Sequence, residues 1–139
     1  MQTFLPIANF DLSAQCLDYS RLGKQRSECK QILANITGQP DRWFNHPAVQ
    51  MWLGYEDALC HYAMSICIEW RRRGYQDDCY NHFEGFLDDP CSIDFEIPWW
   101  FGDERLHSSH RSKLKSKLPS HYNLFGWSEP PNLPYYWPI

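Results

Sequence analysis

The sequence predicts an all-α fold: a single compact domain of about three main helices, with an extended N-terminal arm and an aromatic C-terminal tail. Apolar side chains recur at helical spacing in two long segments, residues 12–36 and 47–73. No two segments show the alternation and turn residues of a β-hairpin. Apolar residues make up 43% of the 139 residues, enough for one core, so we expect residues 1–139 to form one domain.

Residues 1–10 are apolar with an early proline, which predicts an extended arm packed on the body rather than a helix. The first helix is predicted over residues 12–36, with Asp11 as its N-cap and Gly38 after its end. Gly23 inside this helix costs about 1 kcal/mol relative to alanine. Its presence predicts that another backbone, such as that of the arm, or a ligand comes close there.

The second helix is the one that the sequence predicts most strongly. Asn45 is a suitable N-cap, Pro47 suits a first turn, and apolar residues then keep to one face as far as Arg73. The acidic segment that follows, residues 75–104, contains prolines and glycines. We expect it to be mostly loop with one short helix.

The third helix is predicted over residues 110–118, with Ser108 or Ser109 as its N-cap and Pro119 at its end. Beyond it the chain is rich in aromatic residues and proline. We expect this tail to wrap over the helices. No internal repeat is present.

The charge is unevenly distributed. The net charge is −4, but nine of the 17 acidic residues lie between Gly74 and Glu104, a stretch without Lys or Arg. The rest of the chain carries 13 basic residues and 8 acidic ones. Local clusters of cations, rather than the total charge, determine contact with phosphates. The sequence is therefore compatible with a nucleic-acid partner.

Several classes of protein are excluded by missing motifs. The sequence has no phosphate-binding glycine loop, nucleophile elbow, zincin motif or dinucleotide fingerprint. A zinc site built from Cys79, His82 and Cys91 has poor spacing, and we expect the six cysteines to be reduced and mostly buried. We expect no metal or cofactor, no membrane segment, a cytoplasmic location and a monomer.

The basic residues suggest how DNA would be bound. Two basic helices facing each other would form a groove for duplex DNA. The residues that we expect to contact DNA are Arg21, Lys24, Arg26, Lys30, His46, Arg71, Arg72, Arg73, His110, Arg111, Lys113, Lys115, Lys117 and Tyr122. A structural alternative stays open for some of them, because cations at the end of the second helix also suit the helix dipole.

One face of the first helix combines opposite charges. Arg21, Lys24 and Glu28 are three and four residues apart, so a carboxylate can lie beside an ammonium and a guanidinium. This face is either a solvated surface with ion pairs or a reactive site.

The order of these features resembles the pyrimidine dimer DNA glycosylase superfamily, whose members are like phage endonuclease V. The resemblance rests on Tyr-Ser-Arg-Leu-Gly-Lys at residues 19–24, Trp-Arg-Arg-Arg-Gly-Tyr at residues 70–75, and Ser-His-Arg-Ser-Lys-Leu at residues 109–114 with the later His-Tyr. The segments Asn-His-Pro-Ala-Val at 45–49 and Pro-Tyr-Tyr-Trp-Pro at 134–138 are similar to a bacterial and phage branch of it.

The resemblance implies a helical fold and a DNA glycosylase with abasic-site lyase activity that flips a nucleotide out of the duplex. The family uses an N-terminal α-amine, which is partly neutral at pH 7 because the pKa of such amines lies near 8. This amine attacks the sugar C1′ to form a Schiff base. Here Gln2 should leave Met1 in place, so the nucleophile is Met1 or, if Arg21 and burial keep its amine neutral, Lys24.

Besides the retained Met1, the chain departs from the family at a second position. Arg21 stands where the resemblance implies the family's catalytic glutamate. A guanidinium is not a general acid or base at neutral pH, so that role would pass to Glu28 or Asp18. The candidate catalytic residues are thus Met1, Arg21, Lys24 and Glu28. Two alternatives stay open: a catalytically inactive protein of the same fold that senses damaged or modified thymine, and another base-modifying enzyme on this scaffold.

Overall fold

The computed structural model describes residues 1–139. Its regular secondary structure is entirely helical, and the helices are joined by loops. Its elements are α1 (Phe10–Cys16), α2 (Tyr19–Ile36), α3 (Pro47–Gln50), α4 (Glu56–Arg72), α5 (Tyr80–Phe86), α6 (Glu104–Lys117), α7 (Pro119–Tyr122) and the short 3-10 helix η1 (Asn123–Phe125). The all-α fold class is therefore confirmed. No helix is both long enough and apolar enough to cross a membrane.

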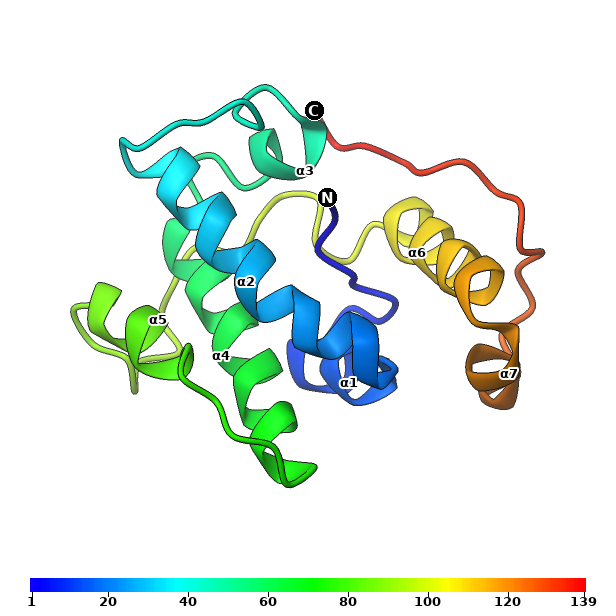
Figure 1. Ribbon diagram of the computed structural model, residues 1–139. Helices are drawn as coiled ribbons and strands as arrows, with labels where there is room; N and C mark the ends of the chain where they lie inside the picture. The colour runs from blue at the N-terminus through cyan, green and yellow to red at the C-terminus, as the bar shows by residue number, and fades with distance from the viewer.

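Helices α2 and α4 run side by side through the centre, and α1 packs on α4 (Figure 1). The two long helices meet because their apolar residues recur at helical spacing: Leu22, Cys29 and Ile32 on α2 have no exposed surface, and neither do Leu59 and Ile66 on α4. This packing creates the core on which the site is built.

The first predicted helix is two helices in the structure. Leu17 and Asp18 are extended, with ψ values of 139° and 164°, and they separate α1 from α2. The break is a tertiary effect: Leu17 is fully buried, and the backbone N–H of Asp18 donates to the Tyr122 hydroxyl at 3.0 Å. The N-cap of α1 is Asn9 rather than Asp11, since the Asn9 side chain accepts from the N–H of Leu12.

The second predicted helix is also interrupted. Helix α3 ends at Gln50, and Gly54, with φ of +87°, lies in the turn before α4. The N-cap of α3 is His46 rather than Asn45, because the His46 Nδ1 accepts from the N–H of Ala48 at 3.0 Å.

The segment between α4 and α6 is mostly loop with one short helix, α5, as predicted. Helix α6 begins earlier than predicted, at Glu104. Asp103 caps it by accepting from the N–H of Arg105, and Ser108 and Ser109 lie inside the helix.

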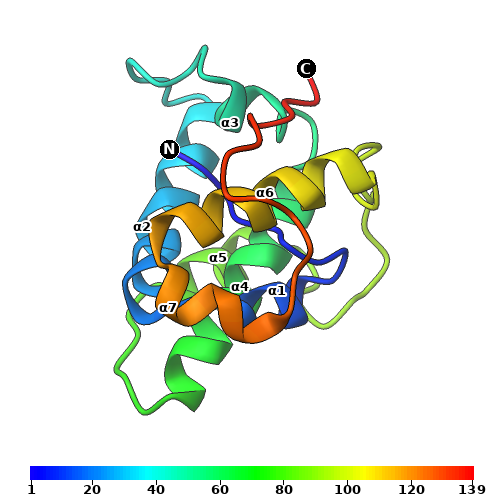
Figure 2. The ribbon, with the colours of Figure 1, turned by 90° about the vertical axis from the view of Figure 1, so that its right-hand side faces the viewer.

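The N-terminal arm threads between the helices. The backbone of Leu5 is held on both sides, because its N–H donates to His110 Nδ1 at 2.9 Å and its carbonyl lies 2.7 Å from His107 Nδ1. The C-terminal tail crosses α6 (Figure 2), where Ser112 and Ser109 accept from the backbone N–H groups of Leu133 and Tyr136. The extended arm and the wrapping tail are therefore confirmed.

Candidate active site

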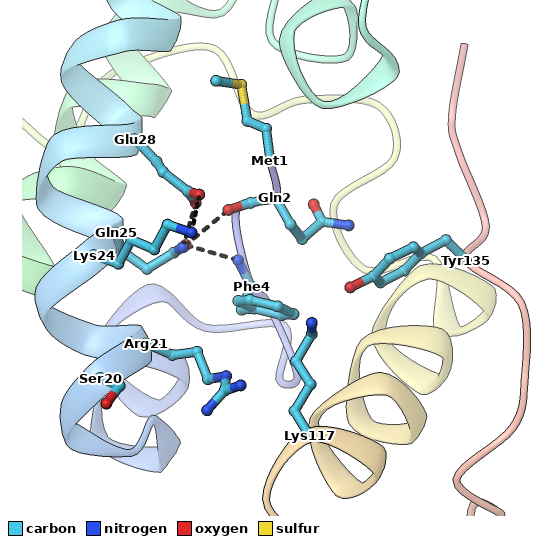
Figure 3. A pocket seen from close by; sticks show the side chains of 10 residues that line it. All are labelled: Met1, Gln2, Phe4, Ser20, Arg21, Lys24, Gln25, Glu28, Lys117 and Tyr135. Atoms are coloured by element: carbon cyan, nitrogen blue, oxygen red, sulfur yellow. Dashed lines mark hydrogen bonds and ion pairs between the residues drawn. The ribbon is translucent and has the colours of Figure 1, made fainter.

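A cavity of about 460 Å³ lies between α2 and α6. The N-terminal arm forms its floor, and the C-terminal tail closes the side next to α6 (Figure 3). The lining residues are Met1, Gln2, Phe4, Ser20, Arg21, Lys24, Gln25, Glu28, Lys117 and Tyr135. The four residues predicted to be catalytic from the sequence, Met1, Arg21, Lys24 and Glu28, thus line one cavity.

Gln25 attaches the arm to α2, a role that the sequence analysis missed. Its Nε2 donates to the Gln2 carbonyl and to Glu28 Oε2, both at 2.9 Å, and its Oε1 accepts from the N–H of Phe4 at 2.9 Å. The Tyr62 hydroxyl donates to the same Oε1 at 2.8 Å. This arrangement holds the first residues of the chain against the Glu28 carboxylate. Gln25 lies four residues after Arg21 on the same helix face, which is the only sequence signal for it.

Glu28 is half-buried at the edge of the cavity. Its Oε1 lies 3.8 Å from the Lys24 ammonium, and the Met1 amine is near enough to influence its ionisation. Burial raises the pKa of Glu28 above its usual value, and the Met1 amine and the Lys24 ammonium only partly offset this effect. A carboxyl group with a raised pKa is suited to transferring protons.

Lys24 is exposed, although its proposed role as the nucleophile required it to be buried. Its side chain is 72% exposed. The Met1 amine, in contrast, belongs to an arm that buried contacts fix in place. Of the two candidate nucleophiles from the sequence, only Met1 belongs to a segment that buried contacts hold beside Glu28.

Arg21 faces the cavity from the start of α2 and lies 3.3 Å from the Asp18 carboxylate. Asp18 also accepts from the buried Tyr122 hydroxyl. Although burial opposes the effect, these hydrogen bonds from Tyr122 and Arg21 hold the pKa of Asp18 below its usual value. Asp18 is thus committed to positioning Arg21 and Tyr122, which leaves Glu28 as the carboxylate available for proton transfer.

Comparison with known proteins identifies the family. The family model described as pyrimidine dimer DNA glycosylase matches residues 1–82, which is more than half of the chain. The chain belongs to this family. Comparison with curated proteins and with solved structures gives no match. The matched region contains the arm and α2, including Met1, Arg21, Lys24 and Glu28, whereas Lys117 and Tyr135 lie outside it.

Membership of a DNA glycosylase family makes DNA the substrate, so the positions of the basic side chains matter. On α6, Lys117 is exposed in the cavity wall, and Lys113 lies 5.2 Å from the Tyr135 ring. Neither lysine has a carboxylate partner, and the same is true of Lys30 on α2. These three lysines can bind phosphates without breaking an ion pair.

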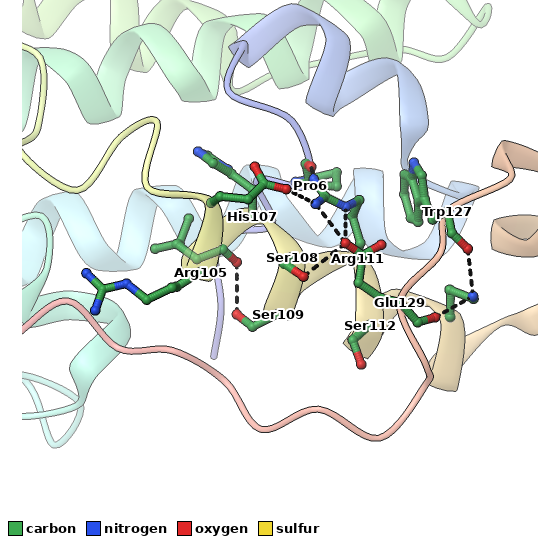
Figure 4. A network of polar contacts seen from close by, with 12 residues as sticks. Pro6, Arg105, His107, Ser108, Ser109, Arg111, Ser112, Trp127 and Glu129 are labelled. Atoms are coloured by element: carbon green, nitrogen blue, oxygen red, sulfur yellow. Dashed lines mark hydrogen bonds and ion pairs between the residues drawn. The ribbon is translucent and has the colours of Figure 1, made fainter.

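Other predicted contacts on α6 and α7 are used to build the fold. His110 and Tyr122 have no exposed surface, so their predicted contact with DNA is wrong. Arg111 bonds Glu129 and the Pro6 carbonyl (Figure 4), and the Lys115 ammonium donates to two carbonyls of the tail. Arg111 and Lys115 therefore attach the arm and the tail to α6.

The arginines at the end of α4, and Arg26 on α2, also form ion pairs within the protein. Arg26 and Arg71 pair with the Asp77 carboxylate at 2.8 Å and 3.4 Å, and Arg72 and Arg73 pair with Glu69. The remaining predicted contact, His46, is occupied as the N-cap of α3. None of these five residues lines the cavity. The predicted DNA contacts that do line it are Arg21, Lys24 and Lys117.

Proposed function

We propose that the protein is a DNA glycosylase with abasic-site lyase activity, acting on a damaged or modified pyrimidine in duplex DNA. The observation that supports this most directly is the cavity between α2 and α6, where the Met1 amine and the Glu28 carboxylate lie among basic side chains. Family membership supports glycosylase chemistry in general.

The proposed reaction starts with the neutral Met1 amine, which attacks C1′ of an extruded nucleotide. The C1′–nitrogen bond forms as the glycosidic bond breaks, and the base leaves with the bonding electron pair and takes up a proton from water. Glu28 accepts the proton that the amine loses and supplies one to open the sugar ring, which gives the Schiff base. Arg21 and Lys117 hold the flanking phosphates.

The test is to trap the Schiff base with borohydride on duplex DNA containing one abasic site. We expect a covalent adduct from the unmodified protein, loss of the adduct when the N-terminus is acetylated, and survival of the adduct in Lys24→Ala. The reverse pattern would assign the nucleophile to Lys24. If neither the protein nor Lys24→Ala gives an adduct, the lyase proposal is wrong.

A second function is favoured by one observation. The Arg21 guanidinium, at the position where the resemblance implies the family's catalytic glutamate, is held by Asp18 at 3.3 Å, an arrangement that suits phosphate binding. A protein of this kind would bind distorted DNA or modified thymine without cutting it. Tight binding to damaged duplexes together with no trapped adduct would support this alternative.

A further inference from the structure

The loop between α5 and α6 exposes large apolar side chains. Ile93 is 90% exposed, Trp99 63% and Ile97 52%. The backbone N–H of Trp99 donates to the Tyr55 hydroxyl at 3.4 Å, which brings this loop to the start of α4, where Leu53 is also exposed. Single exposed apolar residues are common, whereas a group of them on one face marks an interaction surface.

A hollow of about 160 Å³ opens beside Ile93, between α4 and this loop. The ring of Phe95 on the loop stacks on that of His61 on α4, with ring centres 4.2 Å apart, and this contact joins the two walls. We call this feature the acidic hollow, because its lining includes, besides these two rings, the carboxylates of Asp57, Asp88, Asp89 and Asp94.

The carboxylates of the acidic hollow are free to take a cation. All four are exposed, and none of them forms an ion pair within the protein. The stretch from Gly74 to Glu104 offers no Lys or Arg to neutralise them. Burial lowers the pKa of His61, so its ring is mostly uncharged at neutral pH. The acidic hollow therefore carries a net negative charge.

This face lies away from α2 and its side of the cavity. In Figure 2, α2 runs along the left of the molecule, whereas the loop that leads into α6 lies at the right. Carboxylates repel phosphates, so the acidic hollow is not a further contact for DNA. The face stays open to another molecule while DNA occupies the cavity.

We propose that this face docks a partner protein, through a segment in which an arginine or lysine stands among apolar side chains. The cation enters the acidic hollow, where it meets the carboxylates and the Phe95 ring. The apolar side chains of the segment cover Ile93, Ile97 and Trp99 and remove them from water. Charge complementarity determines the kind of partner, because an acidic segment would be repelled and an uncharged one would leave the carboxylates unpaired.

The test uses a fluorescent peptide of alternating arginine and leucine, titrated with the full-length protein and followed by anisotropy. Two reference peptides carry glutamate in place of arginine, or serine in place of leucine. We expect the first peptide to bind at least about tenfold more tightly than either reference. The double change Asp88→Asn and Asp94→Asn, and separately Ile93→Ser, should each weaken its binding about tenfold.

The matched controls are Asp11→Asn and Leu124→Ser, which change an exposed carboxylate and an exposed leucine on other elements. Both should bind the peptide as the wild-type protein does. Circular dichroism checks that each variant is folded. The assay contains no DNA, so its result is independent of the trapping experiment.

Unchanged binding in the two surface variants would overturn the proposal, as would equal binding of the three peptides. Self-association that Ile93→Ser abolishes, measured by sedimentation equilibrium, would assign the face to a second copy of the chain instead. Calcium binding without peptide binding, lost in the double aspartate variant, would assign the carboxylates to a metal ion and would also contradict the proposal.

Discussion

At the scale of single residues, Gly23 is explained by a ring rather than by the arm or DNA. A Cβ at this position would lie 3.0 Å from the Trp70 ring. That ring is fixed, because Tyr19 stacks on it, the Arg26 guanidinium lies 4.5 Å from its centre, and its Nε1 donates to the Gln76 carbonyl. The expectation that the N-terminal arm or a ligand approaches Gly23 is therefore corrected.

We expect Gly23→Ala to lower the free energy of unfolding by about 1 to 3 kcal/mol, since overpacking outweighs the gain in helix propensity. The matched control is Gly85→Ala on α5, where a Cβ meets nothing within 4 Å. This control should be neutral or stabilising by up to about 1 kcal/mol. Urea denaturation of both variants provides the measurement. A stabilised Gly23→Ala would mean that Trp70 moves freely.

Arg21 allows a second prediction at this scale. Arg21→Glu introduces the residue that the family resemblance implies at this position, but it places a carboxylate beside Asp18, which is buried and already bonded to Tyr122. We expect weaker binding to duplex DNA and no gain in cleavage of pyrimidine dimers, because a glutamate repels both the phosphates and Asp18. Arg21→Gln is the control for loss of charge alone. Strong cleavage of pyrimidine dimers by Arg21→Glu would show that the protein is a glycosylase whose activity is lowered by Arg21.

At the scale of elements, α6 divides its cations between two tasks. Arg111 and Lys115 hold the arm and the tail, whereas Lys113 and Lys117 have no carboxylate partner. We expect the double change of Lys113 and Lys117 to Ala to weaken binding to all duplex sequences alike. The slope of the logarithm of affinity against that of salt concentration should decrease by about 0.9 for each phosphate that the variant no longer neutralises.

Arg72→Gln is the matched control for this experiment, because Arg72 is exposed but bonded to Glu69 through two nitrogens. Its salt slope should equal that of the wild-type protein. Affinity measured over a series of salt concentrations tests both variants. An unaltered slope in the double variant would exclude α6 as a phosphate-binding helix.

At the scale of the whole molecule, stability depends on a neutral histidine that joins the arm to α6. His110 is fully buried and accepts from the N–H of Leu5, and burial lowers its pKa to about 3. Below about pH 6.5 the unfolded chain takes up a proton that folded His110 rejects. The free energy of unfolding should therefore fall by up to about 1.4 kcal/mol per pH unit as the pH decreases from 6.5 towards 3.

His110→Asn tests this coupling, because its side-chain oxygen can still accept from Leu5 and does not titrate in this range. The variant should be less stable at pH 7, and its stability should decrease less steeply between about pH 6.5 and 5. Urea denaturation monitored by circular dichroism across this range gives the comparison. Parallel pH profiles for the two proteins would contradict the assignment to His110. His107, whose pKa burial also lowers, contributes to the slope that remains, as do His46 and His61.

The sequence by itself determined the helical class, the extended arm, the wrapping tail and the grouping of charged residues on one face of α2. Periodicity and charge spacing are local properties, so Arg21, Lys24 and Glu28 could be grouped from their intervals alone. Family resemblance added Met1 to this group.

Only the tertiary structure decided where the helices break and which cations are free. The chain is extended at Leu17 and Asp18, between α1 and α2, where the backbone N–H of Asp18 donates to the hydroxyl of Tyr122, more than a hundred residues away. Likewise Arg111 and Lys115 are consumed by the arm and the tail, while Lys117 and Tyr135 close the cavity opposite α2. A sequence pattern describes one segment at a time, whereas hydrogen-bond partners and burial depend on segments that meet only in the folded chain.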